Sequence, residues 1–228
     1  MRFPFLIALK DSLPAFFAYF PLGIVFGVLF TSQLDLPWIM APLMSLITLA
    51  GAIQFVALGI FAANGSLIGL FITSFFVAMR NSFYGLSLLH RFERASFWPR
   101  QYLIYGLVDA TYSIIHNRKE REEEVPYLFH LTWIIHFHWV AGTFIGALFG
   151  KEAFQLPGLE FASAALFTVF FIDQWKKSKN LSIVIVALLS FGIASILLPN
   201  QALIFGIIAS FFYLCLRHFF TKRKKPCP

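Results

Sequence analysis

The sequence has few charged residues and only two cysteines. Asp, Glu, Lys and Arg together make up 13% of the 228 residues, whereas hydrophobic residues make up 59%. Soluble domains have about 25% charged and about 45–50% apolar residues, so the composition predicts a polytopic membrane protein. Cys215 lies in an apolar segment and Cys227 in a basic tail, which suggests neither a disulfide nor a thiolate metal site.

Motifs of enzymes and of metal-binding proteins are also missing. The sequence contains no nucleophile elbow, no HExxH pair and no glycine-rich phosphate loop, which argues against an enzyme. His136 and His138 stand two positions apart and fall on different faces of a helix, which argues against a metal site. No cofactor is expected. The net charge of +7 comes from loops and the tail, so the bilayer, and not nucleic acid, is the expected anionic partner.

Long apolar runs predict eight transmembrane helices, because about 20 residues cross a bilayer core of about 30 Å. They cover residues 12–31, 38–60, 66–90, 101–116, 128–149, 159–175, 180–198 and 201–220. The expected fold is all-α, with residues 1–228 forming a single transmembrane domain. The alternative is seven crossings, in which residues 38–90 form one crossing and a re-entrant segment.

The distribution of Lys and Arg predicts the orientation, because cytoplasmic loops are enriched in these residues. With eight crossings and a cytoplasmic N-terminus, 13 of the 18 basic residues lie inside, four lie outside and Arg80 lies within a span. Seven crossings place six inside and eleven outside. We therefore expect a multi-pass protein of the bacterial cytoplasmic (inner) membrane with both termini in the cytoplasm.

Two stretches of the sequence are similar to each other. GIVFGVLFTSQLDLPW (23–38) and GTFIGALFGKEAFQLPG (142–158) both contain Gly-x-x-x-Gly, a short polar loop and Leu-Pro. Transporters are often built from repeats, so residues 1–116 and 128–221 are candidates for two duplicated halves. Because Gly-x-x-x-Gly is also a common close-packing surface of membrane helices, the resemblance has a second explanation.

Arg80, Asn81 and Tyr84 lie near the middle of the apolar segment 66–90. A central Arg opposes insertion by about 2.5–3.5 kcal/mol, and such residues usually face a protein interior or a wet cavity. Asp109 is the one acid well inside a predicted span and is the natural partner of Arg80, since either charge alone is costly to bury. The two residues are expected to form an ion pair, to couple transport to protons, or both. A purely structural role of Arg80 in joining helices is the alternative.

Gln54 lies in LAGAIQFVALGIF, between Gly51 and Gly59. A helix break at these glycines would expose backbone amides and carbonyls, which together with Gln54 can bind the two ends of a zwitterion. A hydrogen bond between helices is the alternative role of Gln54. The chain is thus expected to be a transporter of a small molecule. The expected binding residues are Gly51, Gln54, Arg80, Asn81 and Tyr84.

Four stretches resemble the AzlC family of branched-chain amino acid permeases. They are PLGIVFGVLF, AGAIQFVALGIFAANGS, VAMRNSFYGLSL and LVDATYSI, in this order over about the first 115 residues. Where the family commonly has an Asp-Glu pair, this chain has Asp109-Ala110. The resemblance implies export of branched-chain or other apolar amino acids together with a small hydrophobic AzlD-type membrane subunit. Because a buried acid such as Asp109 suits a proton relay, we expect a secondary transporter driven by the proton gradient.

Two other functions remain open beside this one. A passive channel for small solutes would need a polar lining along several helices, and a membrane scaffold subunit without transport activity would need no buried polar site. For the partner subunit, the sequence predicts a docking surface on the glycine faces of the first and fifth spans. These faces contain Gly23, Gly27, Gly142 and Gly146.

Overall fold

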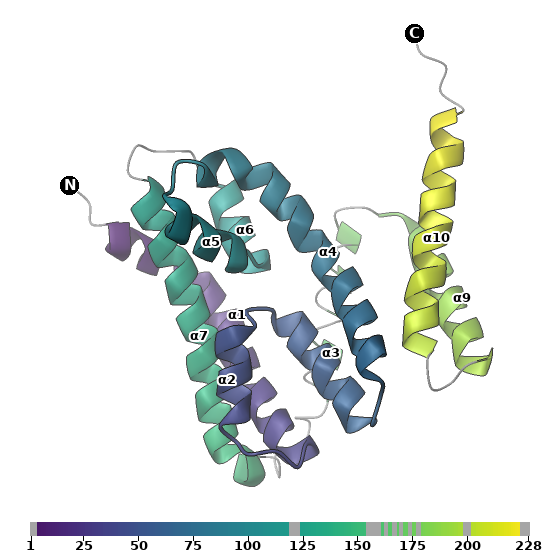
Figure 1. Cartoon of the computed structure of the whole chain (residues 1–228), viewed down its shortest axis with the longest axis horizontal. Helices are drawn as coiled ribbons and strands as arrows, with labels where there is room; N and C mark the ends of the chain where they lie inside the picture. Colours follow the sequence, from purple (N-terminus) through teal and green to yellow (C-terminus); the bar gives the residue numbers. More distant parts are fainter. Residues whose placement is uncertain are drawn as a thin grey trace.

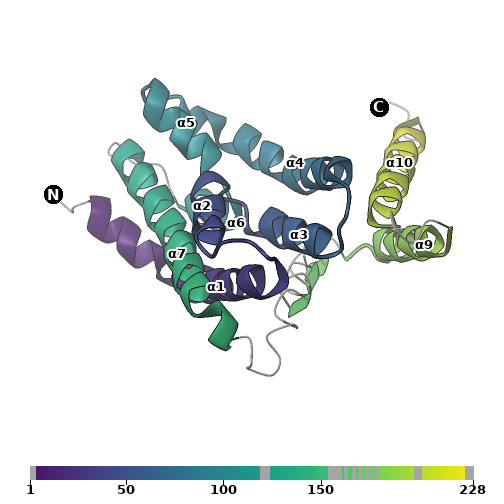
Figure 2. The same ribbon diagram turned by 60° about the horizontal axis from the view of Figure 1, so that its bottom comes forward.

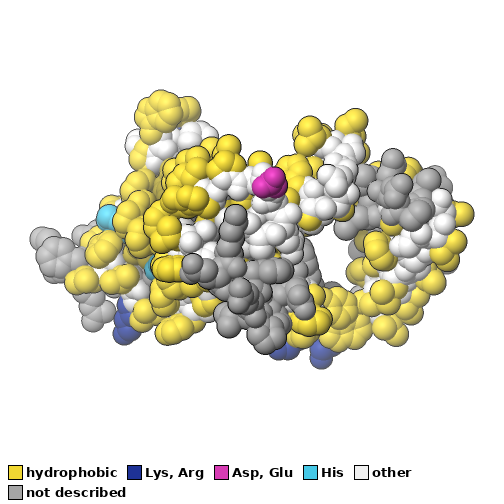
Figure 3. Space-filling model, turned by 90° about the horizontal axis from the view of Figure 1, so that it is seen from below, with side chains coloured by type: hydrophobic (Ala, Val, Ile, Leu, Met, Phe, Trp, Pro, Cys, Tyr) yellow, Lys and Arg dark blue, Asp and Glu magenta, His cyan; other side chains and the backbone are white. Residues whose placement is uncertain are grey.

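The computed structural model describes residues 4–118, 124–153, 179–197, 202–223 and scattered positions between 161 and 176. The regular elements among these residues are helices. Among these helices, α1 (Pro4–Gln33), α4 (Leu67–Phe92) and α7 (Glu124–Ala153) contain spans long and apolar enough to cross a bilayer. Hydrophobic side chains cover much of the described surface in Figure 3, as expected for helices in contact with lipid. The chain is an all-helical membrane protein, but eight crossings are not confirmed.

Two of the expected spans are each a pair of short helices. In place of 38–60 the chain forms α2 (Met40–Ile47) and α3 (Gly51–Ala62). In place of 101–116 it forms α5 (Phe97–Tyr105) and α6 (Asp109–His116). With a rise of about 1.5 Å per residue, the 12 residues of α3 measure about 18 Å, well short of a bilayer core of about 30 Å. The prediction of one continuous helix is therefore wrong for 101–116, whereas in 38–60 the suggested break lies directly before Gly51 and the helix continues through Gly59.

Local hydrogen bonds explain why these helices end inside apolar sequence. At the first break, the backbone of Thr48 leaves the helical region, with φ −123° and ψ 91°, and its carbonyl accepts a hydrogen bond from Gln54 Nε2 at 2.6 Å. At the second break, Val108 is extended, and its N–H donates to Thr111 Oγ1 at 2.8 Å. Side chains thus satisfy backbone groups that a helix would otherwise pair, and hydropathy does not record such bonds.

The centre of the fold is the pair α1 and α7, which run side by side in the same direction (Figures 1 and 2). A Cβ atom on Gly27 would collide with the Thr143 carbonyl, and one on Gly146 with the Ile24 carbonyl. The glycines therefore allow the two backbones to approach closely. The prediction that these faces receive a helix of a partner subunit is wrong, because the chain covers them itself.

The ends of α1, α4 and α7 define two faces of the molecule. Arg118 forms an ion pair with Asp11 near the start of α1, and Tyr127 near the start of α7 donates to the same carboxylate at 2.9 Å. Arg91, near the end of α4, donates to the Ile115 and Arg118 carbonyls at 2.6 and 3.1 Å. The face where α1 and α7 begin, called the N-terminal face, is thus the face where α4 ends.

The two pairs of short helices start from opposite faces of the molecule. The α2–α3 pair connects the end of α1 to the start of α4, and both of these points lie at the face opposite the N-terminal face (Figure 1). The α5–α6 pair connects the end of α4 to Arg118, and both of these lie at the N-terminal face. Each pair is thus a hairpin that starts and ends at the same face of the molecule. The alternative with a re-entrant segment within 38–90 agrees with this arrangement, and the second hairpin was not expected.

The tips of the two hairpins meet each other beside α7. Tyr105 at the end of α5 donates to the Leu46 carbonyl near the end of α2 at 3.0 Å. A long helix followed by a hairpin therefore occurs twice, once as α1 to α3 and once, inverted, as α4 to α6 (Figure 1). This repetition differs from the expected halves 1–116 and 128–221, which stay a prediction.

The last described helices, α9 (Leu181–Leu197) and α10 (Ala202–Arg223), pack against each other beside α4 (Figure 1). Phe211 of α10 contacts Phe76 of α4, with ring centroids 5.2 Å apart. The expected span 159–175 and the basic residues at 119–123 and beyond 223 lie largely or wholly outside the described residues.

Candidate functional site

Arg80 of α4 and Asp109 of α6 meet in the interior of the fold. Arg80 Nη2 lies 2.7 Å from Asp109 Oδ2, and Tyr84, one turn after Arg80, donates its hydroxyl hydrogen to Asp109 Oδ1 at 2.9 Å. The two charged side chains are each about one third exposed, at 32% and 30%. The pair that the sequence suggested is thus in direct contact and remains accessible from a cavity.

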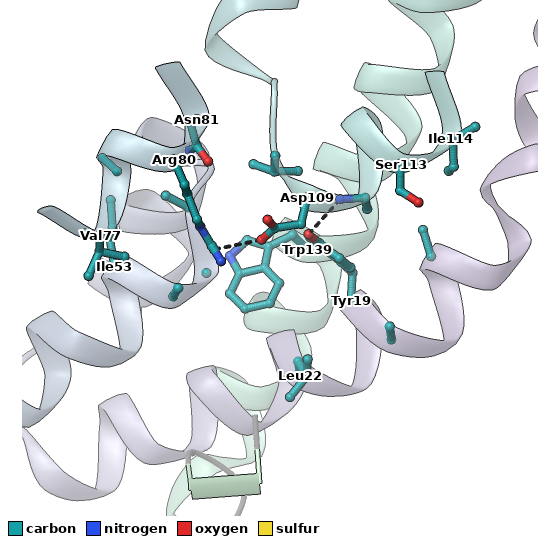
Figure 4. A pocket seen from close by; sticks show the side chains of 18 of the residues that line it. Tyr19, Leu22, Ile53, Val77, Arg80, Asn81, Asp109, Ser113, Ile114 and Trp139 are labelled. Carbon is teal, nitrogen blue, oxygen red and sulfur yellow. Dashed lines mark hydrogen bonds and ion pairs between the residues drawn. The ribbon is translucent and has the colours of Figure 1, made fainter. Parts of the chain in front are cut away.

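The cavity beside this pair has a volume of about 370 Å³. Its walls come from α1, the start of α3, the middle of α4, the start of α6 and Trp139 of α7 (Figure 4). Apart from Arg80, Asn81, Asp109 and a few hydroxyl groups, the lining consists of aliphatic and aromatic residues and glycine. A small molecule with a polar part and an apolar part fits such a lining.

Two half helices begin at the cavity. Residues 50–53 at the start of α3 and residues 108–110 at the start of α6 belong to the lining. The first amides of a helix have no partner within the helix and carry partial positive charge. In α6 the Ala110 N–H approaches the Tyr19 hydroxyl at 3.4 Å, whereas the start of α3 has no side-chain cap. The α3 end can therefore attract an anionic group that enters the cavity.

Four of the predicted site residues line the cavity: Gly51, Arg80, Asn81 and Asp109. The side-chain oxygen of Asn81 is buried and has no hydrogen-bond partner. Gly51 lies against the indole of Trp139, where a Cβ atom would come within 2.8 Å of the ring. Its lack of a side chain is thus what lets α3 approach α7 at this point.

Gln54 lies behind the cavity wall. It is completely buried, its Oε1 accepts hydrogen bonds from Trp139 Nε1 at 2.8 Å and from Ser45 Oγ at 3.3 Å, and its Nε2 donates to the Thr48 carbonyl. Ser45 also pairs with Thr143 Oγ1 at 2.9 Å. These bonds hold the α2–α3 break against α7. The structure thus favours the alternative of an interhelical hydrogen bond for this residue.

Tyr84 acts on the site through Asp109 rather than through the cavity lining. Its ring stacks on Tyr112 with centroids 4.1 Å apart, and Tyr112 stacks in turn on His116 of the same helix. The stack fixes the direction of the Tyr84 hydroxyl toward the Asp109 carboxylate. Tyr84 is thus placed to orient the carboxylate.

Two lining residues were not expected from the sequence. Tyr19 of α1 and Trp139 of α7 both border the cavity (Figure 4). The side chain of Trp139 is 2% exposed and packs in the core. Aromatic residues are common in membrane helices both at interfaces and in cores, so their type alone does not separate the two positions.

Comparison with known proteins gives a consistent set of relatives. The family model described as "AzlC protein" matches residues 14–152. The "Branched-chain amino acid transport protein AzlC" of Bacillus subtilis is 33% identical over 212 residues, which is 88% of this chain and 82% of the relative. An uncharacterized membrane protein of Helicobacter pylori is 34% identical over 202 residues, covering 82% of this chain and 88% of the relative. One of Haemophilus influenzae is 32% identical over 199 residues, 83% of this chain and 81% of the relative. No solved structure matches.

Proposed function

The chain belongs to the AzlC family, and we propose that it is a secondary transporter that exports branched-chain amino acids across the bacterial cytoplasmic membrane. The observation that carries this proposal is the Arg80–Asp109 pair at an apolar cavity between two half helices. Transporters commonly hold their substrate near the bilayer midplane at such interrupted helices. The relative in Bacillus subtilis is named for branched-chain amino acid transport, which supports the substrate class.

A free amino acid matches the cavity through its two charged ends. Its carboxylate would bind Arg80, whose planar guanidinium can donate two parallel hydrogen bonds, beside the uncapped start of α3. Its ammonium would bind Asp109 and the side-chain oxygen of Asn81. An aliphatic side chain would then contact the apolar walls, which include Leu22 and Ile53.

Transport is proposed to be driven by the proton gradient and to need a small AzlD-type membrane subunit. The proton coupling rests on the buried ionisable side chains, and the partner subunit rests on the family. The glycine faces of α1 and α7 no longer support the partner, since they pack against each other.

We further propose six crossings instead of eight, made in chain order by α1, α4, α7, the apolar segment 159–175, α9 and α10. Each hairpin then enters and leaves the membrane on one side: α2–α3 on the outside and α5–α6 on the inside. With a cytoplasmic N-terminus, 16 of the 18 basic residues lie inside, Lys151 lies outside and Arg80 lies within α4. Eight crossings give 13 inside and four outside, because they place Arg91, Arg94 and Arg100 outside. The stronger bias supports six crossings.

Counterflow of labelled leucine into liposomes tests the proposed function. The liposomes contain the full chain, with or without a small AzlD-type subunit, and are loaded with unlabelled leucine. A carrier gives a transient accumulation of label that unlabelled isoleucine suppresses and glycine does not, because glycine has no side chain to contact the apolar walls. Equal leak of many solutes would support a passive channel. Absence of leucine counterflow in both preparations would support a scaffold subunit and contradict the proposal.

A further inference from the structure

A second buried polar site lies between the tips of the two hairpins, and it centres on His136 of α7. Its side chain is 8% exposed, and Nδ1 lies 3.1 Å from the Tyr102 hydroxyl of α5. The carbonyls of Ser45 and Leu46, near the end of α2, lie beside the ring. Nε2 is buried and has no hydrogen bond of ordinary geometry. His136 is therefore a point where both hairpins contact one long helix.

The surroundings of His136 suit a side chain that gains and loses a proton. In the neutral ring one nitrogen donates and the other accepts, whereas both nitrogens donate in the imidazolium. When the Tyr102 hydroxyl donates to Nδ1, the ring hydrogen sits on Nε2 and points toward the α2 carbonyls. When both nitrogens carry hydrogen, the Tyr102 oxygen must accept instead. Protonation thus changes a contact to the α5–α6 hairpin.

Helix ends favour a positive charge at this position. α2 ends at Ile47 and α5 ends at Tyr105, and both ends lie at the hairpin tips next to α7. The carboxyl ends of helices carry partial negative charge, and in transporters the carboxyl ends of half helices hold coupling ions. An imidazolium here would face two such ends.

Other ionisable groups at this site are few among the described residues. Tyr102 and Tyr105 face it from α5, and α2, with the sequence MAPLMSLI, has no ionisable side chain. On α7 itself, His138 turns toward α1, where its ring contacts Phe16 at 5.0 Å between centroids. Arg80 and Asp109 line the substrate cavity, and His136 is not part of that lining.

We propose that His136 is the group that carries the coupling proton, in a site separate from the substrate cavity. This inference rests on the proposed transport function. A proton from the external water adds to the neutral imidazole nitrogen, and the same proton leaves to the cytoplasmic water as substrate moves outward. No other bond forms or breaks. Asp109, held by Arg80 and Tyr84, then serves the substrate ammonium.

A short path connects the proton site to the substrate cavity. Trp139 follows His136 by one turn of α7, so both side chains lie on the same side of the helix. Trp139 donates to Gln54 and supports Gly51 at the cavity. A shift of the α2–α3 tip on protonation of His136 would therefore move a wall of the substrate cavity.

The test compares His136→Gln with His138→Gln in liposomes that contain the full chain. Two quantities are measured for each: leucine exchange without a gradient, and leucine accumulation driven by a pH gradient. We expect His136→Gln to exchange leucine but to lose accumulation, because substrate movement is uncoupled from protons. His138→Gln should keep both activities. Gradient-driven accumulation by His136→Gln at the wild-type level would overturn the inference, whereas a wild-type protein without leucine exchange would contradict the proposed function itself.

Tyr102→Phe provides a second variant if His136→Gln does not fold. It keeps the aromatic ring in the core and removes the hydroxyl group that contacts Nδ1. The pH at which gradient-driven leucine transport is half-maximal should shift relative to wild type. A pH profile that is the same in Tyr102→Phe and wild type would overturn the inference.

Discussion

Arg80 stands near the middle of α4, a helix that is otherwise built for contact with hydrocarbon. A central Arg costs about 2.5–3.5 kcal/mol on insertion, and the fold provides a carboxylate at 2.7 Å to offset this cost. An ion pair alone does not need a cavity, and a purely structural pair would be expected to be packed on all sides. The pair here borders a space of about 370 Å³, which favours a role in binding.

Arg80→Lys is predicted to impair leucine export nearly as much as Arg80→Ala. Lysine keeps the charge but loses the planar arrangement of donors that binds a carboxylate through two hydrogen bonds. A hydrogen bond to a charged group contributes roughly 1.5–3 kcal/mol, so export should fall by about tenfold or more at low substrate concentration. The measurement is labelled leucine export together with the amount of folded protein in the membrane.

The double variant Arg80→Ala with Asp109→Ala separates binding from stability. If removal of Arg80 alone lowers the yield, removal of both charges should restore it, because neither charge is then left unpaired. Export should stay absent. Recovery of both yield and export in the double variant would show that the pair is structural and not part of the substrate site. Arg94→Ala, at an exposed arginine beyond the end of α4, is the matched control and should export normally.

At the scale of elements, the close contact of α1 and α7 sets the positions of the other helices. Gly23, Gly27, Gly142 and Gly146 bring the two backbones together, as small residues do in membrane helix pairs. The Asp11–Arg118 ion pair and the Tyr127 hydrogen bond join the same helices at the N-terminal face. The hairpins then insert beside this pair, and α2 contacts α7 through Ser45 and Thr143.

Gly27→Ala is predicted to destabilise the protein. The added methyl group would collide with the Thr143 carbonyl and the Ala147 amide, both of which are backbone atoms that cannot move aside locally. Overpacking of this kind costs about 1–3 kcal/mol. The melting temperature in detergent should therefore fall. Gly192→Ala in α9, where a Cβ atom meets nothing within 4 Å, is the control and should leave the melting temperature unchanged or raise it slightly. Equal melting temperatures for Gly27→Ala and wild type would show that this contact is absent in the protein.

At the scale of the whole molecule, two hairpins from opposite faces place four helix ends between these faces. The starts of α3 and α6 lie at the substrate cavity, and the ends of α2 and α5 lie at His136. Partial positive charge thus gathers at one interior site and partial negative charge at another. One set of ends suits an anionic group of the substrate, and the other suits a cation.

Cysteine labelling in intact cells is predicted to support six crossings. Single cysteines are introduced by Ala63→Cys and Arg94→Cys into a chain with Cys215→Ser and Cys227→Ser; both new positions are exposed. Six crossings place position 63 outside and position 94 inside, so an impermeant thiol reagent should label only the first. Eight crossings predict the reverse. Labelling of position 94 in intact cells would therefore contradict the re-entrant arrangement, and permeabilised cells provide the control for reactivity.

The sequence by itself determined the class of the protein and the residues that had to be explained. Low charge content and long apolar runs are properties of composition, so they predict a membrane protein whatever the fold. An Arg and an Asp inside apolar segments also stand out without a structure, because each is costly to bury alone. For the same reason Arg80 and Asp109 could be matched before their contact was known.

Only the tertiary structure decided that the two interrupted segments turn back as hairpins and which residues surround the cavity, whereas the break at Gly51 was already suggested by the sequence. Hydropathy measures the composition of a segment and not its direction, so a hairpin of two short apolar helices looks the same as one span. The Gln54 and Thr111 side chains end these helices through local hydrogen bonds to the backbone, which hydropathy does not record. Trp139 is likewise buried because α1 and α7 pack through glycine, which is a property of the assembled pair and not of either segment.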